Sequence, residues 1–66
     1  MLQLNVTYLM QILDMKEITI TDFCAAVGIP RSTYYTWIQD PRHVRIDDVQ
    51  RIANTLKIPA IDLLLE

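Results

Sequence analysis

The chain has 66 residues, of which 52% are hydrophobic, and it carries a net charge of −2. A chain of this length forms one domain, which we place over residues 1–66, and its core is small enough that dimerisation would add useful stability. The apolar content excludes a disordered chain, and one glycine is too few for a turn-rich β domain. The only cysteine, Cys24, excludes an intrachain disulfide. The sequence therefore predicts an all-α domain.

Basic residues concentrate in the middle of the chain. Residues 30–45 have a net charge of +2, from three arginines and one aspartate, whereas residues 1–29 and residues 46–66 each carry −2. Because phosphate contacts supply most nonspecific DNA affinity, the overall charge argues against a general nucleic-acid binder. The basic segment nevertheless suits a small footprint on DNA. A solvated loop with a few arginines is the other interpretation of the same charges.

Several classes of protein are disfavoured by what the sequence lacks. Polar residues interrupt the apolar N-terminal segment and no basic residue precedes it, so it does not predict a secretory signal. No apolar run approaches the roughly 20 residues of a membrane-spanning helix. Metal-ligand clusters, nucleotide-binding glycine loops and paired catalytic carboxylates are missing as well. We therefore expect a cytoplasmic protein that is not an enzyme and has no cofactor, metal or evident small-molecule ligand.

The first predicted helix covers residues 6–15. Asn5 suits its N-cap, and Leu4 before the cap can pack against Leu9 as a hydrophobic staple. Apolar residues recur along the segment with helical spacing and predict one buried stripe. This stripe consists of Val6, Leu9, Met10 and Leu13.

Two short helices joined by a glycine are predicted next, over residues 20–27 and 31–39. Thr19 suits the N-cap of the first of them. Gly28 can adopt the positive φ that ends this helix, and Pro30 suits the start of the next because its missing N–H would be unpaired there. Two helices joined by such a turn form a helix-turn-helix, whose second helix can enter a DNA major groove.

The second helix of this unit divides into two faces. Tyr34 and Trp37 are three residues apart and point inward on the helical period. The outer face collects a guanidinium, hydroxyls and an amide, which are groups that read base edges in a major groove. Its residues are Arg31, Ser32, Tyr35, Thr36 and Gln39. The Asp40-Pro41 pair ends the helix, because a residue before proline avoids the α region.

Two further helices are predicted over residues 46–56 and 60–65. The first has acidic residues in its first turn, where the helix dipole favours them, and an apolar face toward the core. This face consists of Ile46, Val49, Ile52, Ala53 and Leu56. The second carries more apolar residues than one narrow face can bury, so some of them predict a dimer surface. The residues of that surface are Ile61, Leu64 and Leu65.

Over residues 4–65 the chain resembles the Cro/repressor-type helix-turn-helix family, also called the XRE family, of phage and bacterial transcription regulators. The resemblance rests on a helix cap with a following apolar pair, a glycine turn, a serine-threonine start of the recognition helix and an acidic-leucine-leucine finish. These motifs are here Thr19, Phe23-Cys24, Val27-Gly28-Ile29, Ser32-Thr33 and Asp62-Leu63-Leu64. The resemblance implies a compact lambda-repressor-like domain of four to five helices that binds DNA.

The resemblance also implies roles for individual residues. By position in the recognition helix, it implies that base edges are read by Arg31, Ser32 and Thr36. Contacts with the DNA backbone are implied for residues along the helix and in the loop that follows it. These residues are Pro30, Tyr35, Gln39, Arg42, His43 and Arg45.

Two functions remain open from the sequence. The leading hypothesis is a sequence-specific transcription regulator that binds a double-stranded DNA operator as a homodimer, with residues 31–39 of two copies in successive major grooves. The alternative is a module of the same fold that works through protein contacts, for example an antirepressor. The acidic net charge favours this alternative, as do Ile20 and Ile38, which replace polar residues common in the family.

Overall fold

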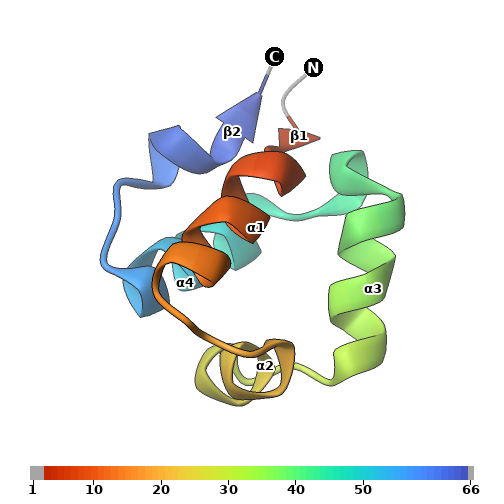
Figure 1. The fold of residues 1–66 in the computed structure, drawn as a ribbon. Coiled ribbons are helices and arrows are strands. Elements are labelled where there is room, and N and C mark those ends of the chain that lie inside the picture. Colours follow the sequence, from red (N-terminus) through yellow and green to blue (C-terminus); the bar gives the residue numbers. More distant parts are fainter. Residues whose placement is uncertain (1–2, 66) are drawn as a thin grey trace.

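The computed structural model describes residues 3–65, and this part of the chain contains four α-helices. They are α1 (Val6–Met15), α2 (Ile20–Val27), α3 (Arg31–Gln39) and α4 (Ile46–Leu56). Two short 3-10 helices, η1 (Pro41–His43) and η2 (Ala60–Leu63), and two strands, β1 (Gln3–Leu4) and β2 (Leu64–Leu65), accompany them. Apart from the two-residue strands, this is the all-α architecture that the sequence predicted. Figure 1 shows α3 along one side of the molecule, α2 at one end and both strands at the other.

The turn between α2 and α3 begins at Gly28, which has the left-handed conformation with φ 87° and ψ 37°. The amides of Gly28 and Ile29 both donate to the carbonyl oxygen of Cys24, at 2.8 and 3.0 Å, and so close the end of α2. At the other end of α2, the Thr19 hydroxyl accepts from the amide of Asp22 at 3.1 Å. Pro30 then has the extended conformation and immediately precedes α3. The predicted helix-turn-helix is therefore confirmed.

All four α-helices contribute side chains to one apolar core. Phe23 of α2 and Tyr34 of α3 meet edge to face, with ring centroids 5.9 Å apart. An edge-to-face pair stabilises the core beyond the apolar area that the two rings bury, because the partial charges of ring edge and ring face attract each other. The buried apolar residues are Leu4, Leu9, Ile12, Leu13, Phe23, Cys24, Val27, Tyr34, Trp37, Val49, Ile52, Ala53, Leu56 and Leu63. No helix within residues 3–65 has the length and hydrophobicity that crossing a membrane requires.

The end of the chain differs from the helix expected over residues 60–65. Residues Ala60–Leu63 form a 3-10 helix, and Leu64 is extended and pairs with Leu4 in the antiparallel β1–β2 ladder. The amide of Asn5 also donates to the carbonyl of Leu63 at 2.7 Å. Pairing with the N-terminal strand therefore supplies hydrogen-bond partners for backbone groups that an α-helix would otherwise have paired internally. The expectation of a helix through residue 65 was wrong for this reason.

Two residues expected in the core are exposed instead. Met10 is 51% exposed, because α1 buries Leu9, Ile12 and Leu13 and so turns a different face inward. Ile46 is 62% exposed at the first position of α4, one turn before the buried Val49.

Candidate nucleic-acid interface

Helix α3 is anchored by two large aromatic side chains on its inner face. Tyr34 and Trp37 are only 3% and 6% exposed, as the helical period predicted. Burial raises the pKa of the Tyr34 hydroxyl, and the neighbouring Tyr35 and Cys24 raise it further. The phenol therefore stays neutral in the core at ordinary pH. With this face fixed, the opposite face of α3 has a defined direction.

The outer face of α3 is exposed along its whole length. Every residue predicted there has an exposed side chain, namely Arg31, Ser32, Tyr35, Thr36 and Gln39. Pro30, directly before the helix, is exposed as well. These residues form a continuous strip that carries a guanidinium, two hydroxyl groups, a phenol and an amide, the groups that hydrogen-bond to base edges and phosphates.

The hydroxyl of Thr36 is partly engaged within the helix. Its oxygen donates to the carbonyl of Ser32 at 3.0 Å, one turn earlier. A threonine that donates back to its own helix keeps free lone pairs on the oxygen and fixes the position of its methyl group. On this face it therefore offers an acceptor and an apolar contact rather than a donor.

Tyr35 is held at the border between the core and the exposed strip. Its ring meets the ring of the buried Tyr34 edge to face, with centroids 5.4 Å apart, while 45% of its surface stays exposed. One side of the phenol is thus fixed by the core, and the other side is free to contact a ligand.

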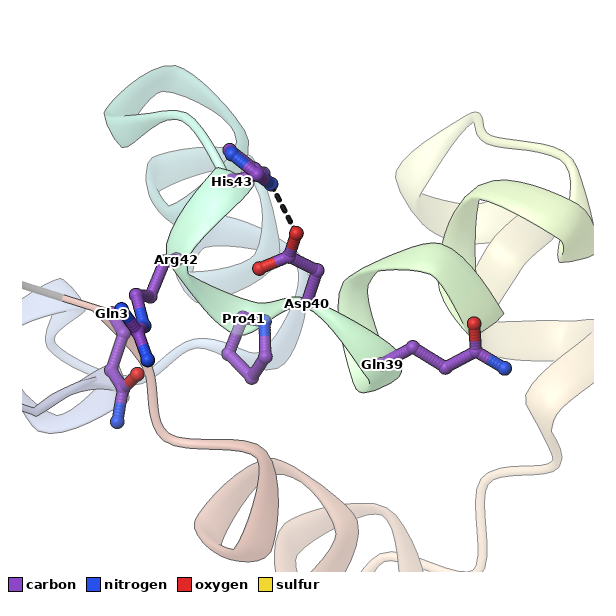
Figure 2. Close-up of a pocket in the computed structure, with 6 residues that line it drawn as sticks. All are labelled: Gln3, Gln39, Asp40, Pro41, Arg42 and His43. Carbon is purple, nitrogen blue, oxygen red and sulfur yellow. Dashed lines mark hydrogen bonds and ion pairs between the residues drawn. The ribbon is translucent and has the colours of Figure 1, made fainter.

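A hollow of about 530 Å³ lies where α3 ends and η1 begins (Figure 2). Its lining residues are Gln3, Gln39, Asp40, Pro41, Arg42 and His43. The ring Nδ1 of His43 contacts the carboxylate of Asp40. Figure 2 shows Gln3 of β1 beside Arg42 of η1, whereas Gln39 extends in another direction from the end of α3. The hollow is open to solvent, and its walls carry both the Arg42 guanidinium and the Asp40 carboxylate.

The structure thus places the predicted loop residues in two positions. Arg42 and His43 line the hollow, and Arg45 is exposed at the N-cap of α4 without a side-chain capping bond. Gln3 lines the hollow too, although sequence analysis did not select it. No local pattern marks this residue, because the contact between β1 and η1 joins segments that are far apart in the sequence.

Two apolar residues near this surface are packed rather than exposed. Ile20, at the start of α2, and Ile38, near the end of α3, are half-buried and pack against the core. Ile38 therefore supports α3 from behind and leaves the outer strip polar.

The lone thiol lies inside the protein. Cys24 is 3% exposed, and burial raises the pKa of its thiol while the positive charge of Arg31 opposes the rise. A thiol with a raised pKa is a poor nucleophile at neutral pH. Within residues 3–65, no group of three or more His, Cys, Asp or Glu side chains is arranged to hold a metal ion.

The surface predicted for dimerisation is exposed in part. Ile61 is 74% exposed and Leu65 is 41% exposed. Leu64 is half-buried and packs against the core. All three lie on η2 and β2. Figure 1 shows η2 across the molecule from α3, and β2 beside β1 at one end.

A family model described as the Cro/C1-type HTH DNA-binding domain matches residues 8–64 of the chain. Comparisons with curated proteins and with solved structures gave no significant match. The matched range includes α2, the glycine turn and α3, and it continues to the first residue of β2.

Proposed function

The chain belongs to the family of Cro/C1-type helix-turn-helix DNA-binding domains, which act in transcription regulation, and from this premise we propose that it recognises a specific DNA operator as a homodimer. The observation that carries the proposal is the exposed strip of α3. Its polar side chains are presented by a helix whose inner face is locked in the core by Tyr34 and Trp37. A rigid helix with such a face is what major-groove recognition requires.

Three residues of the strip are assigned to base edges. Arg31 is in the first turn of α3 and can donate two parallel hydrogen bonds to guanine O6 and N7. Ser32 can donate to N7 of either purine or accept from the amino group of adenine. Thr36, whose proton goes to the Ser32 carbonyl, suits an adenine or cytosine amino group or the methyl group of thymine.

The DNA backbone is assigned to the remaining residues of the surface. Before α3 this is Pro30, on α3 they are Tyr35 and Gln39, and beyond it they are Arg42, His43 and Arg45. The arginines supply positive charge for phosphate oxygens, and the hollow beside η1 has room for one. The amide of Gln3 on its wall adds a neutral donor for the same group. Asp40 opposes an anion there, and its carboxylate contacts the ring of His43.

A homodimer would use the exposed apolar residues of η2 and β2. Ile61, Leu64 and Leu65 are the residues proposed for the contact between copies. A twofold dimer would place its two α3 helices about 34 Å apart along the duplex, one helical turn of DNA. Ile61→Asp should convert the dimer to a monomer in sedimentation experiments and should weaken operator binding. A wild-type monomer at high micromolar concentration would contradict this part of the proposal.

Arg31 provides the sharpest test of the assignment on α3. After an operator is selected from random DNA, Arg31→Ala should cost about 1–3 kcal/mol of binding free energy and should relax the preference at one base pair. Lys16→Ala, which removes an exposed cation from the end of α1, serves as the matched control and should change affinity little. Unchanged affinity and sequence preference in Arg31→Ala would remove this residue from the base-reading set.

The acidic net charge supports a second candidate, a module that acts through protein contacts. Ile20 and Ile38, which replace polar residues common in the family, are half-buried and pack against the core, so neither offers an exposed apolar contact. A gel-shift experiment distinguishes the two candidates. A DNA-binding domain must retard a duplex at low salt, and this retardation must disappear as the salt concentration rises. A protein-contact module would retard no duplex under any salt condition.

A further inference from the structure

Helix α2 ends without a positive charge of its own. It has eight residues, and its last turn contains no basic side chain. The carbonyl groups at the end of a helix lack intrahelical donors and carry a partial negative charge. Cys24 uses its carbonyl to accept from the two turn amides, so the carbonyl of Val27 needs a partner from elsewhere.

That partner comes from α4. The Nη2 atom of Arg51 donates to the carbonyl oxygen of Val27 at 2.6 Å, across 24 positions of sequence. The guanidinium also faces the turn, because a Cβ atom on Gly28 would lie 3.2 Å from Nη2. Asp48, one turn earlier on α4, has a carboxylate oxygen 3.6 Å from Nη1 and helps to orient the group. Arg51 therefore connects α4 with the point at which α2 gives way to the turn.

We propose that Arg51 is a positioning residue for DNA recognition, which holds the end of α2 and thereby sets the direction in which α3 leaves the turn. The inference rests on the proposed function. Only Gly28, Ile29 and Pro30 separate the two helices, and Pro30 has a fixed φ. A shift at Val27 is therefore passed to the start of α3, where Arg31 and Ser32 lie. Base readers need placement within about 0.5 Å and 10–20°, so a small shift reduces specific binding.

The test compares three variants with the wild-type chain. Arg51→Met removes the donors and the charge but keeps an unbranched side chain, and Arg51→Lys keeps the charge with a single-point donor. Lys16→Met removes one exposed cation from the end of α1 and is the matched control for charge. All measurements are made at a temperature where circular dichroism shows each variant to be folded. If Arg51→Met does not fold, Arg51→Lys decides the outcome.

The first readout requires no DNA. Hydrogen exchange at the amides of Gly28 and Ile29, which close the end of α2, should be faster in Arg51→Met and intermediate in Arg51→Lys. Lys16→Met should leave these rates unchanged. Wild-type exchange rates in Arg51→Met would overturn the inference, because the end of α2 would then not depend on the guanidinium.

The second readout is binding to the selected operator and to a random duplex. Loss of a charged hydrogen bond that positions α3 should weaken operator binding about tenfold in Arg51→Met, with partial recovery in Arg51→Lys. The slope of log affinity against log salt should stay the same. A slope whose magnitude falls by about 1.8, or 0.9 for each copy of the dimer, would mark Arg51 as a direct phosphate contact and would overturn the positioning role. An operator affinity of Arg51→Met equal to that of the wild type would also overturn the positioning role. A wild-type chain that binds no DNA would instead refute the proposed function itself.

Discussion

Replacement of Gly28 by alanine should destabilise the domain strongly, because two separate costs arise at this position. The residue has φ 87°, a conformation that costs an L-amino acid about 1–2 kcal/mol. The added Cβ would lie 3.2 Å from Nη2 of Arg51, which must shift while it holds the Val27 carbonyl at 2.6 Å. Weakening that charged hydrogen bond adds a further fraction of its roughly 1.5–3 kcal/mol.

Together these costs amount to about 1.5–3 kcal/mol. A domain of this length is expected to have a free energy of unfolding of about 3–10 kcal/mol, so the loss is a large part of the total. The midpoint of thermal unfolding should fall by about 6–24 °C, at roughly 4–8 °C for each kcal/mol. Circular dichroism at 222 nm follows this transition directly, because the described fold is mostly helical.

Two further variants separate the causes. Gly28→Asn introduces a Cβ on a residue that tolerates positive φ, so it should lose less stability than Gly28→Ala. Combining Gly28→Ala with Arg51→Met should cost less than the sum of the single changes, since both act on the same hydrogen bond. An unfolding midpoint of Gly28→Ala equal to that of the wild type would refute the account of the turn.

Three other changes test the supports of α2 and α3. Thr19→Ala removes the hydroxyl that accepts from the Asp22 amide and should cost about 1 kcal/mol in urea unfolding. Trp37→Ala removes a side chain that is 6% exposed and should cost about 3–5 kcal/mol, enough to unfold much of the population in far-UV dichroism. Burial raises the pKa of Cys24 in the folded state, so the unfolded chain loses this proton first and stability should fall as pH rises through the ordinary value of 9.0. The raised pKa of Tyr34 extends the loss beyond its ordinary value of 10.0.

Conservative variants provide the controls for these changes. Thr19→Ser keeps the capping hydroxyl and should stay close to the wild type, and Trp37→Phe should lose less stability than Trp37→Ala. Cys24→Ala should reduce the loss of stability over the first part of the alkaline range, because the thiol that titrates there is removed. Wild-type stability in Thr19→Ala or Trp37→Ala would contradict the role given to that residue. Stability that is constant from about pH 8 to about pH 11 would contradict the burial of both ionisable groups.

The parts of the fold that sequence analysis predicted are those that depend on near neighbours. Thr19 accepts from an amide three residues away, and Gly28 ends α2 through its own backbone conformation. Tyr34 and Trp37 follow the helical period and are buried. In each case the deciding interaction lies within one helical turn, where residue type and spacing are sufficient information.

The parts that sequence analysis missed depend on residues far apart in the chain. The β1–β2 ladder joins Leu4 to Leu64 and replaces the end of the expected helix. The contact of β1 with η1, also between distant segments, places Gln3 on the wall of the hollow. Arg51 was assigned no role, because the Val27 carbonyl it binds is 24 positions away. The local sequence pattern of α4 does not indicate which distant group the guanidinium of a long side chain will contact. The base-reading and backbone roles given to the exposed strip remain predictions.

The most direct test of the central claim is a binding titration of the wild-type chain on an operator selected from random DNA, repeated over a range of salt concentrations. If Arg42 and Arg45 of two copies each neutralise one phosphate, log affinity should fall with log salt at a slope of about −3.6. The operator should bind more tightly than a random duplex of equal length throughout the salt range. Equal binding to both duplexes, or no binding at low salt, would contradict the claim that this domain is a sequence-specific DNA reader.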